Sequence, residues 1–430
     1  MVREAERADA IYDEVQEQQG APEERRERPW KRYLEAELGL RNHWYPAFFS
    51  NELKEGETRH EMLLGERIYF KRVRGRVFAV EDRCPHRAAP FSSRVECYTA
   101  NTITCPVHGF TYDIRDGKLV SILTENDSAL VGKLSVPPYP VEEKFSLVWV
   151  YIGDGEPRAL REDVLPTLWN TPDLVMLPTT RYKIRANWRV AIENGYDTGH
   201  LYGHRNWASA WRYGAVLPIG TVNKTKDDIV LLEEPGAPVG MHVKSSVNTW
   251  VGEVEGVKVH MNMLDLDNVP PKEGGLYPPG FGPFLPCGLD VPGFPRPGLF
   301  HWEWYVPVDE EHHMYTILQG AQAQTEEERE NFHREHEEYL ARDVWVDPGT
   351  ARAMEPPGFN NFDSFGREVM QHAYKNEDWW RRERLYKADY TIIQWRNLVS
   401  RHAEVVQTRA ARGFAKPDSL TRSYPENPIP

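Results

Sequence analysis

The chain has few cysteines, no long apolar run and no excess of positive charge. Its 430 residues include four cysteines, too few and too scattered for a disulfide framework, which fits a reducing cytoplasm. No stretch approaches the roughly 20 apolar residues of a transmembrane helix, and the Glu- and Arg-rich segment 1–28 has no signal-peptide core. A net charge of -13 opposes binding to nucleic acid or to anionic membranes. Small molecules and proteins remain as partners.

Composition divides the chain into four segments. Residues 1–42 have apolar side chains spaced for one helical face and predict an N-terminal helical arm, whereas residues 43–156 hold short β-rich runs separated by turns. Residues 157–410 carry longer strands and helices rich in Trp and Tyr, and residues 411–430 form a weakly ordered tail. We expect an α+β protein. A small antiparallel β domain would precede a larger catalytic domain whose antiparallel sheet is flanked by helices.

Three strands and one loop are predicted in detail. Residues 68–70 and 77–80 flank a turn at Arg74 and Gly75, and residues 147–152 form a further β-rich run. Residues 270–297 contain many Pro and Gly and little periodicity. They are predicted to form a loop that serves as a pocket wall or lid.

Two cysteine–histidine pairs are the most specific motif. They are Cys84 with His86 and Cys105 with His108, and each lies between predicted strands. A Rieske [2Fe–2S] centre needs these four ligands, because one iron takes both thiolates and the other both imidazoles. A structural zinc site uses the same ligand types, but zinc fingers normally place their histidines together. The pattern favours the redox cluster, with zinc as the alternative.

A second candidate metal site lies in residues 187–204. On a helix, Glu193, Asp197, His200 and His204 would fall at positions i, i+4, i+7 and i+11, all on one side. Two imidazoles about one turn apart can hold one metal ion. The alternative is a helix whose half-buried histidines meet ordinary partners.

Two histidines and one carboxylate form the facial triad of non-haem Fe(II) oxygenases. The carboxylate must come from elsewhere in the chain, and Asp343, Asp347 and Asp363 are the candidates. We prefer Asp363, because it immediately precedes a predicted helix over residues 364–374 and would be held at a fixed angle.

With both constellations present, the chain resembles the terminal oxygenase (α) component of Rieske non-haem iron ring-hydroxylating oxygenases. The resemblance covers roughly residues 38–408. Its most specific pieces are the two cysteine–histidine loops and residues 41–46, 193–204, 303–307, 358–370 and 392–396. It departs from the family in a longer N-terminal arm, an insertion within residues 339–357 and a poor match over residues 205–280.

The resemblance implies a role for each metal-site residue. Asp363 matches the carboxylate ligand of the iron. Asp197 matches a catalytic acid that connects a cluster histidine of one subunit, here His108, to an iron histidine of the next, here His200. The implied assembly is a homotrimer arranged head to tail. Electrons would come from a ferredoxin and an NAD(P)H-dependent ferredoxin reductase.

The resemblance also implies a substrate pocket. It would include the backbone of Gly195, with Phe294 and Phe359 as aromatic walls and His301 where relatives carry another polar residue. Such walls suit flat fused rings. The implied reaction is angular addition of both atoms of O2 to an aromatic N-heterocycle such as carbazole.

Three other functions fit parts of the pattern. The first is a monooxygenase with the same two centres acting on a related N-heteroaromatic such as 2-oxoquinoline, which product analysis distinguishes. The second is a Rieske electron-transfer protein without oxygen chemistry, although a stand-alone ferredoxin needs only roughly 100 residues. The third is a zinc-stabilised binding protein, which would be colourless and lack acid-labile sulfide.

Overall fold

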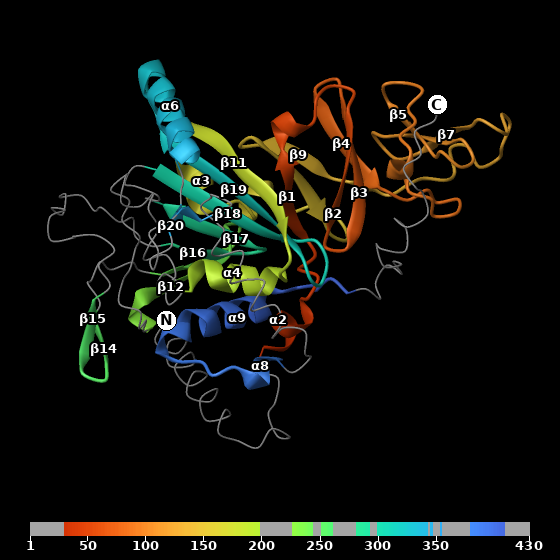
Figure 1. The fold of residues 1–430 in the computed structure, drawn as a ribbon. Helices are drawn as coiled ribbons and strands as arrows, with labels where there is room; N and C mark the ends of the chain where they lie inside the picture. Colours follow the sequence, from red (N-terminus) through yellow and green to blue (C-terminus); the bar gives the residue numbers. More distant parts are fainter. Residues whose placement is uncertain are drawn as a thin grey trace.

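The computed structural model combines a small β domain, a large sheet and a group of helices below that sheet (Figure 1). The residues it describes are 30–197, 226–243, 251–260, 281–292, 299–342, 345–346, 353–354 and 379–408. None of the helices in these ranges is long and apolar enough to cross a membrane.

Three antiparallel sheets make up the N-terminal part. A four-stranded sheet has the order β2-β3-β4-β8, a three-stranded sheet the order β5-β6-β7, and a second three-stranded sheet the order β1-β10-β9. The bounds are β1 His43–Phe49, β2 Thr58–Leu63, β3 Glu66–Val73, β4 Arg76–Glu81, β5 Thr102–Thr104, β6 Phe110–Asp113, β7 Leu119–Ile122, β8 Pro138–Tyr139, β9 Val141–Lys144 and β10 Leu147–Ile152. Every predicted strand of this region is thereby confirmed.

A seven-stranded antiparallel sheet forms the centre of the larger part, in the order β11-β19-β18-β17-β16-β13-β12. Its strands are β11 Leu174–Ile184, β12 Ile229–Leu232, β13 Gly240–Val243, β16 Gly282–Phe284, β17 Gly288–Pro292, β18 Leu299–Pro307 and β19 His313–Gln322. Two small hairpins pair β14 Val251–Val254 with β15 Val257–His260 and β20 Trp345–Val346 with β21 Ala353–Met354. The expected α+β fold is confirmed.

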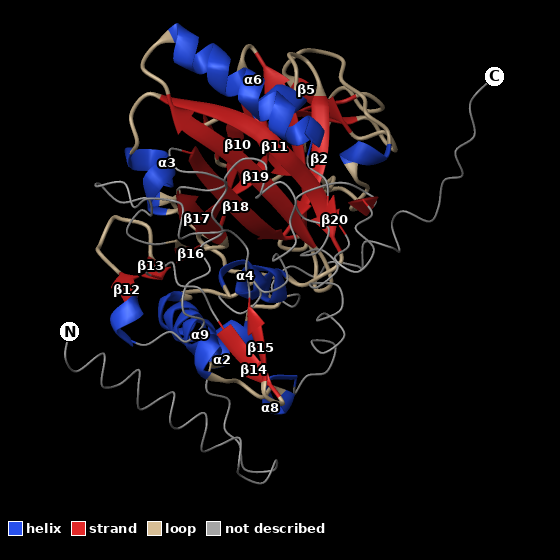
Figure 2. Cartoon of the chain, turned by 60° about the vertical axis from the view of Figure 1, so that its left-hand side comes forward, coloured by secondary structure: helices blue, strands red, loops and turns tan. Residues whose placement is uncertain are grey.

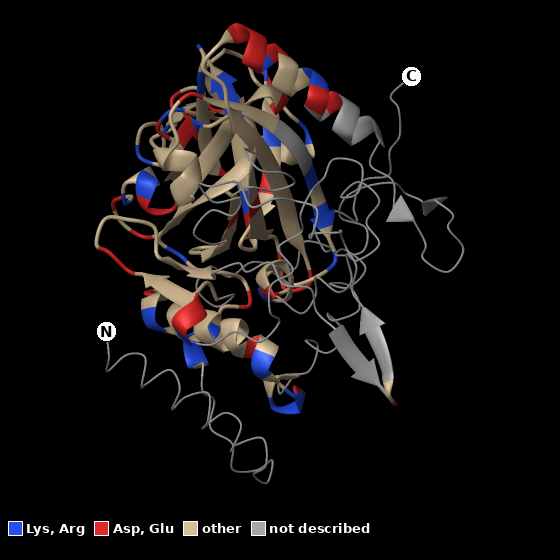
Figure 3. Ribbon diagram, turned by 90° about the vertical axis from the view of Figure 1, so that its left-hand side faces the viewer, with Lys and Arg blue, Asp and Glu red and all other residues tan. Residues whose placement is uncertain are grey.

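The helices flank this large sheet (Figure 2). They are α2 Lys31–Glu35, α3 Pro166–Asn170, α4 Trp188–Tyr196, α6 Glu326–Arg342, α8 Trp379–Arg382 and α9 Tyr390–His402, with short 3-10 turns at η2 Ser50–Glu52, η3 Phe91–Ser93, η4 Leu160–Glu162, η6 Lys226–Asp228 and η8 Lys387–Asp389. Helix α4 packs on β16, β17 and β18, and α2 packs on α9. Helix α6, with Glu326, Glu327 and Glu328 in its first turn, lies at the opposite end of the sheet, and Figure 3 shows its acidic residues in red.

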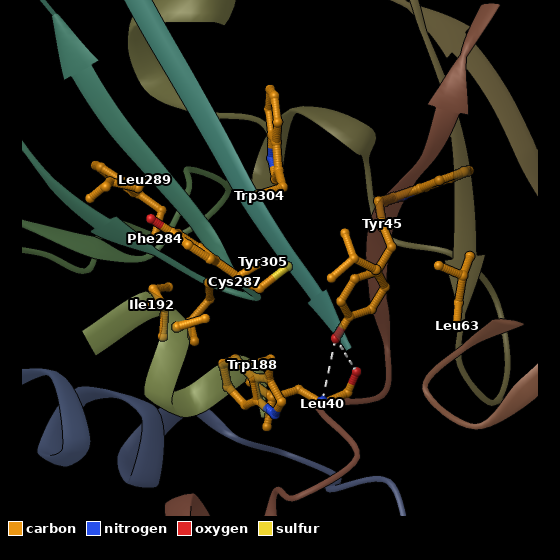
Figure 4. Close-up of a cluster of buried hydrophobic side chains, with 14 of the residues drawn as sticks. Leu40, Tyr45, Leu63, Trp188, Ile192, Phe284, Cys287, Leu289, Trp304 and Tyr305 are labelled. Carbon is orange, nitrogen blue, oxygen red and sulfur yellow. Dashed lines mark hydrogen bonds between the residues drawn. The ribbon is translucent and has the colours of Figure 1, made fainter. Parts of the chain in front are cut away.

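One hydrophobic core joins the sheet β1-β10-β9 to the large sheet. Trp149 of β10 meets Trp304 of β18 edge to face, with ring centroids 5.6 Å apart. Tyr45 lies in the same core, where its hydroxyl donates to the Leu40 carbonyl over 2.6 Å (Figure 4). A separate, smaller core contains both Cys84 and Cys105. The two cysteine loops therefore pack on a hydrophobic core that is separate from the main one.

One local prediction needs correction, and another is tested only over residues 30–42. The segment 270–297 is not a continuous loop, because β16 and β17 form a hairpin within it, and the buried Cys287 lies at its turn. Pairing with β13 and β18 overrides the Pro- and Gly-rich composition. In the N-terminal arm the described residues contain only the five-residue helix α2, and residues 1–29 and the tail beyond 408 lie outside the described residues.

Candidate functional site

The two cysteine loops have the same backbone conformation. The residue four positions after each cysteine, Ala88 or Gly109, donates its N–H to that cysteine's carbonyl, over 2.8 Å from Ala88 to Cys84 and 3.0 Å from Gly109 to Cys105. Each cysteine N–H also donates to the carbonyl five positions further on, over 2.8 Å in both loops. Ala88 and Gly109 both have positive φ, 61° and 72°. Two equivalent turns therefore face each other across one site.

The four predicted ligands are brought together with the sulfurs inside and the imidazoles outside. Cys84 and Cys105 are each 1% exposed, whereas His86 is exposed and His108 partly so. The two imidazole rings lie 4.8 Å apart, edge to face. His86 also stacks on Phe110, with centroids 4.5 Å apart and planes 7° apart. The ring positions are thus fixed by packing.

The two thiols share a hydrogen bond. It raises the pKa of the Cys84 thiol and lowers the pKa of the Cys105 thiol to about 6. The N–H groups of Val107 and His108 also donate to the Cys105 sulfur and lower its pKa further. A proton held between two thiols marks a place where a metal centre can replace it.

The donors around the sulfurs suit an iron–sulfur cluster. The Tyr112 hydroxyl lies 3.4 Å from the Cys84 sulfur, and the backbone N–H of His86 also donates to that sulfur. Hydrogen bonds to sulfur tune the reduction potential of such clusters. The residues present therefore fit such a cluster: Cys84 and Cys105 would hold one iron, and His86 and His108 the other.

The predicted helix through the second metal site is shorter than expected. Helix α4 ends at Tyr196, and Asp197 has extended backbone angles, φ -62° and ψ 116°. Its N–H still donates to the Glu193 carbonyl over 3.0 Å. The expectation that one helix carries Glu193, Asp197 and both histidines is therefore wrong at Asp197. His200, His204, Asp343, Asp347, Asp363, Phe294 and Phe359 lie outside the described residues.

Glu193 has a partner far along the chain. Arg396 of α9 donates to both of its carboxylate oxygens, over 2.6 and 2.8 Å, and to both oxygens of Glu383. The Tyr33 hydroxyl of α2 donates to Glu193 as well. Glu193 therefore links α4 to α9 and α2 through hydrogen bonds. Sequence spacing gave no signal for this, because Arg396 is 203 residues away.

An acidic environment surrounds Asp197. Burial raises the pKa of Asp389 to about 7, and the negative charges of Asp197 and Glu383 add to the shift. Burial raises the pKa of Tyr386 too, again with Asp197 contributing. The end of α4 thus meets the segment before α9, a contact the sequence did not indicate.

His301 and Gly195, both predicted for the pocket, lie at the interface between the large sheet and α4. His301 of β18 is 1% exposed, and its Nε2 lies 2.7 Å from Glu303 Oε1. The Tyr305 hydroxyl donates to the other Glu303 oxygen. A Cβ added at Gly195 would meet that hydroxyl at 2.1 Å, so the helix approaches the strand as closely as glycine allows.

The fold and the loops together define a Rieske-type oxygenase. Residues 43–140 match the model of the Rieske [2Fe-2S] domain, and residues 151–407 match the model of the homotrimeric ring hydroxylase. The chain is 37% identical over 389 residues to the carbazole 1,9a-dioxygenase terminal oxygenase component of a Sphingomonas species, covering 89% of this chain and 97% of the relative. The corresponding component of Metapseudomonas resinovorans is 35% identical, with 90% and 97% covered.

Solved structures show the same relationship. A fluorene-bound oxygenase variant in complex with the ferredoxin of carbazole 1,9a-dioxygenase superposes with a TM-score of 0.79 and is 33% identical, covering 89% of this chain and 96% of that one. The chain belongs to the homotrimeric ring hydroxylase family of Rieske oxygenases. It is the terminal oxygenase of a Rieske aromatic ring-hydroxylating system. The expected [2Fe–2S] cluster and mononuclear non-haem iron are confirmed at the level of the family.

Proposed function

We propose that the chain adds both atoms of O2 to an aromatic N-heterocycle such as carbazole, by angular dioxygenation. The observation that carries this proposal is the 37% identity to a carbazole dioxygenase component over 97% of that relative's length. The cluster supplies single electrons, and the mononuclear iron supplies the place where O2 reacts.

Cys84, Cys105, His86 and His108 are the proposed cluster ligands. The buried sulfurs and outward rings support this assignment, because they place the imidazole-bound iron where electrons can enter and leave. The two equivalent turns bring the four ligands to one site.

His200, His204 and Asp363 are the proposed iron ligands, and Asp197 is the proposed link between the two centres. Asp197 lies just beyond the end of α4, three residues before His200. In a head-to-tail homotrimer it would meet His108 of a neighbouring copy. A carboxylate between two imidazoles holds both rings by hydrogen bonds and fixes their tautomers.

Gly195 is the proposed recognition point for a substrate N–H. Because α4 ends one residue later, the Gly195 carbonyl is among the last four of the helix, which no N–H of the helix itself can satisfy. It also lies at the negative end of the helix dipole. Phe294, Phe359 and His301 would complete the pocket and exclude water around a flat ring system.

A ferredoxin, itself reduced by an NAD(P)H-dependent ferredoxin reductase, is the proposed electron donor. The relative in the solved complex binds a ferredoxin. Around the cluster loops of this chain, Val107 and Leu123 are 55% and 48% exposed. Apolar side chains beside exposed histidines suit the docking of a small redox protein or of a neighbouring copy.

The test is product analysis with a complete electron supply. Purified protein with a cluster spectrum is incubated with ferredoxin, reductase, NADH and each of carbazole, dibenzofuran, fluorene and 2-oxoquinoline under 18O2. The proposal expects two labelled oxygens in a ring-opened biphenyl-type diol from carbazole. One labelled oxygen, or turnover of 2-oxoquinoline alone, would instead establish the monooxygenase.

A further inference from the structure

We infer that Glu303 is a positioning residue for the substrate-facing backbone of α4, acting through Tyr305 on Gly195, with His301 holding Glu303 in place. This inference rests on the proposed function of Gly195. The juxtaposition that carries it is a buried line of three polar side chains on β18, ending on the one glycine of α4 that the strand touches.

Strand alternation places the three residues on one face of the sheet. His301, Glu303 and Tyr305 are 1%, 7% and 0% exposed. The alternate residues serve the other face, where Trp302 donates to Thr167 over 2.8 Å and Trp304 meets another tryptophan. A polar line therefore occupies the face that α4 covers.

Glu303 accepts two of the hydrogen bonds of this line. A carboxylate only accepts, so Tyr305 donates its O–H to one oxygen and His301 donates its Nε2–H to the other. The remaining ring nitrogen, Nδ1, then accepts from the Gln319 amide, whose nitrogen is 3.1 Å away. The imidazole is thereby held from both sides, and the Glu303 carboxylate with it.

Tyr305 transmits this position to α4. A Cβ at Gly195 would lie 2.1 Å from the Tyr305 oxygen and 2.9 Å from its Cζ. The hydroxyl thus rests against the Gly195 backbone, in the core where β18 faces α4 (Figure 4). The position of the Tyr305 oxygen is set by its hydrogen bond to Glu303. The distance between the last turn of α4 and the sheet, and the tilt of that turn, therefore depend on the Glu303 carboxylate.

Stability alone does not account for a carboxylate at this place. Burying an ion is unfavourable even when it is paired. Aliphatic side chains such as Leu289, which also touches Gly195, would pack against the helix without that cost. Unlike an aliphatic side chain, the carboxylate accepts a directional hydrogen bond, and this bond fixes where the Tyr305 oxygen lies.

The test compares two tricyclic ligands of similar shape, of which carbazole carries an N–H and dibenzofuran an ether oxygen. Their dissociation constants are measured by fluorescence on the assembled oxygenase with its cluster oxidised. Tyr305→Phe and Glu303→Leu should weaken carbazole binding about tenfold, the ratio expected for one hydrogen bond. Dibenzofuran binding should change less than about twofold. Equal weakening of both ligands, or no change for either, would overturn the inference.

Glu303→Gln provides the conservative rescue. A glutamine oxygen can still accept from Tyr305, and its amide can donate to His301 if the imidazole proton moves to Nδ1 and the Gln319 amide turns over. Carbazole affinity close to wild type is expected, and a loss as large as in Glu303→Leu would contradict the positioning role.

Thr316→Val is the matched control, because it removes a buried hydroxyl from the opposite face of the same sheet. Amide hydrogen exchange over residues 188–197 provides a readout independent of ligand. Exchange should be faster in Tyr305→Phe and Glu303→Leu than in Thr316→Val, and equal exchange would refute the inference. If the wild-type protein binds neither ligand, the proposed function fails, and the exchange data still decide whether Glu303 positions α4.

Discussion

Arg396 and Glu193 form a two-pronged ion pair in the interior, with Nε to Oε1 at 2.6 Å and Nη2 to Oε2 at 2.8 Å. The arginine side chain is fully buried and also lies over the rings of Trp30 and Trp379, at 4.9 and 5.1 Å. Four helices meet at this point, because Glu193 belongs to α4, Arg396 to α9, Trp379 to α8, and Trp30 directly precedes α2. The pair holds the helix that leads to Asp197.

Removing the arginine should therefore destabilise the protein strongly. Arg396→Met leaves the buried Glu193 and the partly buried Glu383 without their cation, and the free energy of unfolding should fall by about 3–5 kcal/mol. Arg401→Gln is the control on the same helix, where a partly exposed pair with Glu233 should contribute less than about 1 kcal/mol. Chemical denaturation of both variants measures the difference, and equal small effects would contradict the role given to Arg396.

Substitutions at the matching positions of the two cysteine turns should differ in their effect on stability. Ala88→Gly relieves a positive φ of 61° and should change the free energy of unfolding by less than about 1 kcal/mol. Gly109→Ala introduces that strain and places a Cβ 2.9 Å from the Leu123 Cβ, so it should lose about 1–3 kcal/mol. Cluster absorbance per protein should fall only in Gly109→Ala. Similar losses of stability and of cluster absorbance in both variants would contradict this prediction.

A buried carboxyl group should make stability depend on pH. Burial raises the pKa of Asp290 from 3.8 to about 6, against the lowering effect of hydrogen bonds from Thr167. Between these values the folded protein binds more protons than the unfolded chain, so the free energy of unfolding falls as pH rises through this window. Asp290→Asn should remove the contribution of this carboxyl group to the change of the free energy of unfolding with pH. Denaturation curves at pH 4, 5, 6 and 7 test this, and parallel profiles for both proteins would exclude it.

Asp197→Asn should separate metal binding from turnover. The amide keeps the shape of the side chain but removes the charge, so cluster absorbance and iron content should stay at wild-type levels. Ferredoxin-supported oxidation of substrate should fall at least about tenfold, since the proposed link between the two centres is lost. Asp116→Asn, which removes an exposed partner of Lys118 in the β domain, is the control. Oxidation at the normal rate in Asp197→Asn would contradict the proposed electron route.

Short-range pattern was enough for several features of this protein. The cysteine–histidine spacing predicted the cluster site, and the structure places all four side chains around one point. Short β-rich runs bounded by turn residues predicted β3, β4 and β10, which the structure confirms. These predictions worked because a turn, a strand or a ligand pair depends on neighbours a few residues away.

Tertiary structure decided what depends on distant partners. Helix α4 ends at Tyr196, although the spacing of Glu193 and Asp197 suited a longer helix. His313 is fully buried, and its Nδ1 lies 2.8 Å from the carbonyl of Ala186, 127 positions away in the chain. The end of this helix and the burial of this histidine depend on packing and desolvation between segments far apart in the chain. The local periodicity of the sequence does not predict them.

The cluster motif and the family of the chain were therefore determined by the sequence, since ligand chemistry needs only the right residues at the right spacing. Only the tertiary structure showed that Arg396 pairs with Glu193, and that Tyr305, which donates to Glu303, lies against Gly195. Both contacts join residues over a hundred positions apart, and a buried charge or hydroxyl acquires its role only when folding removes water from around it.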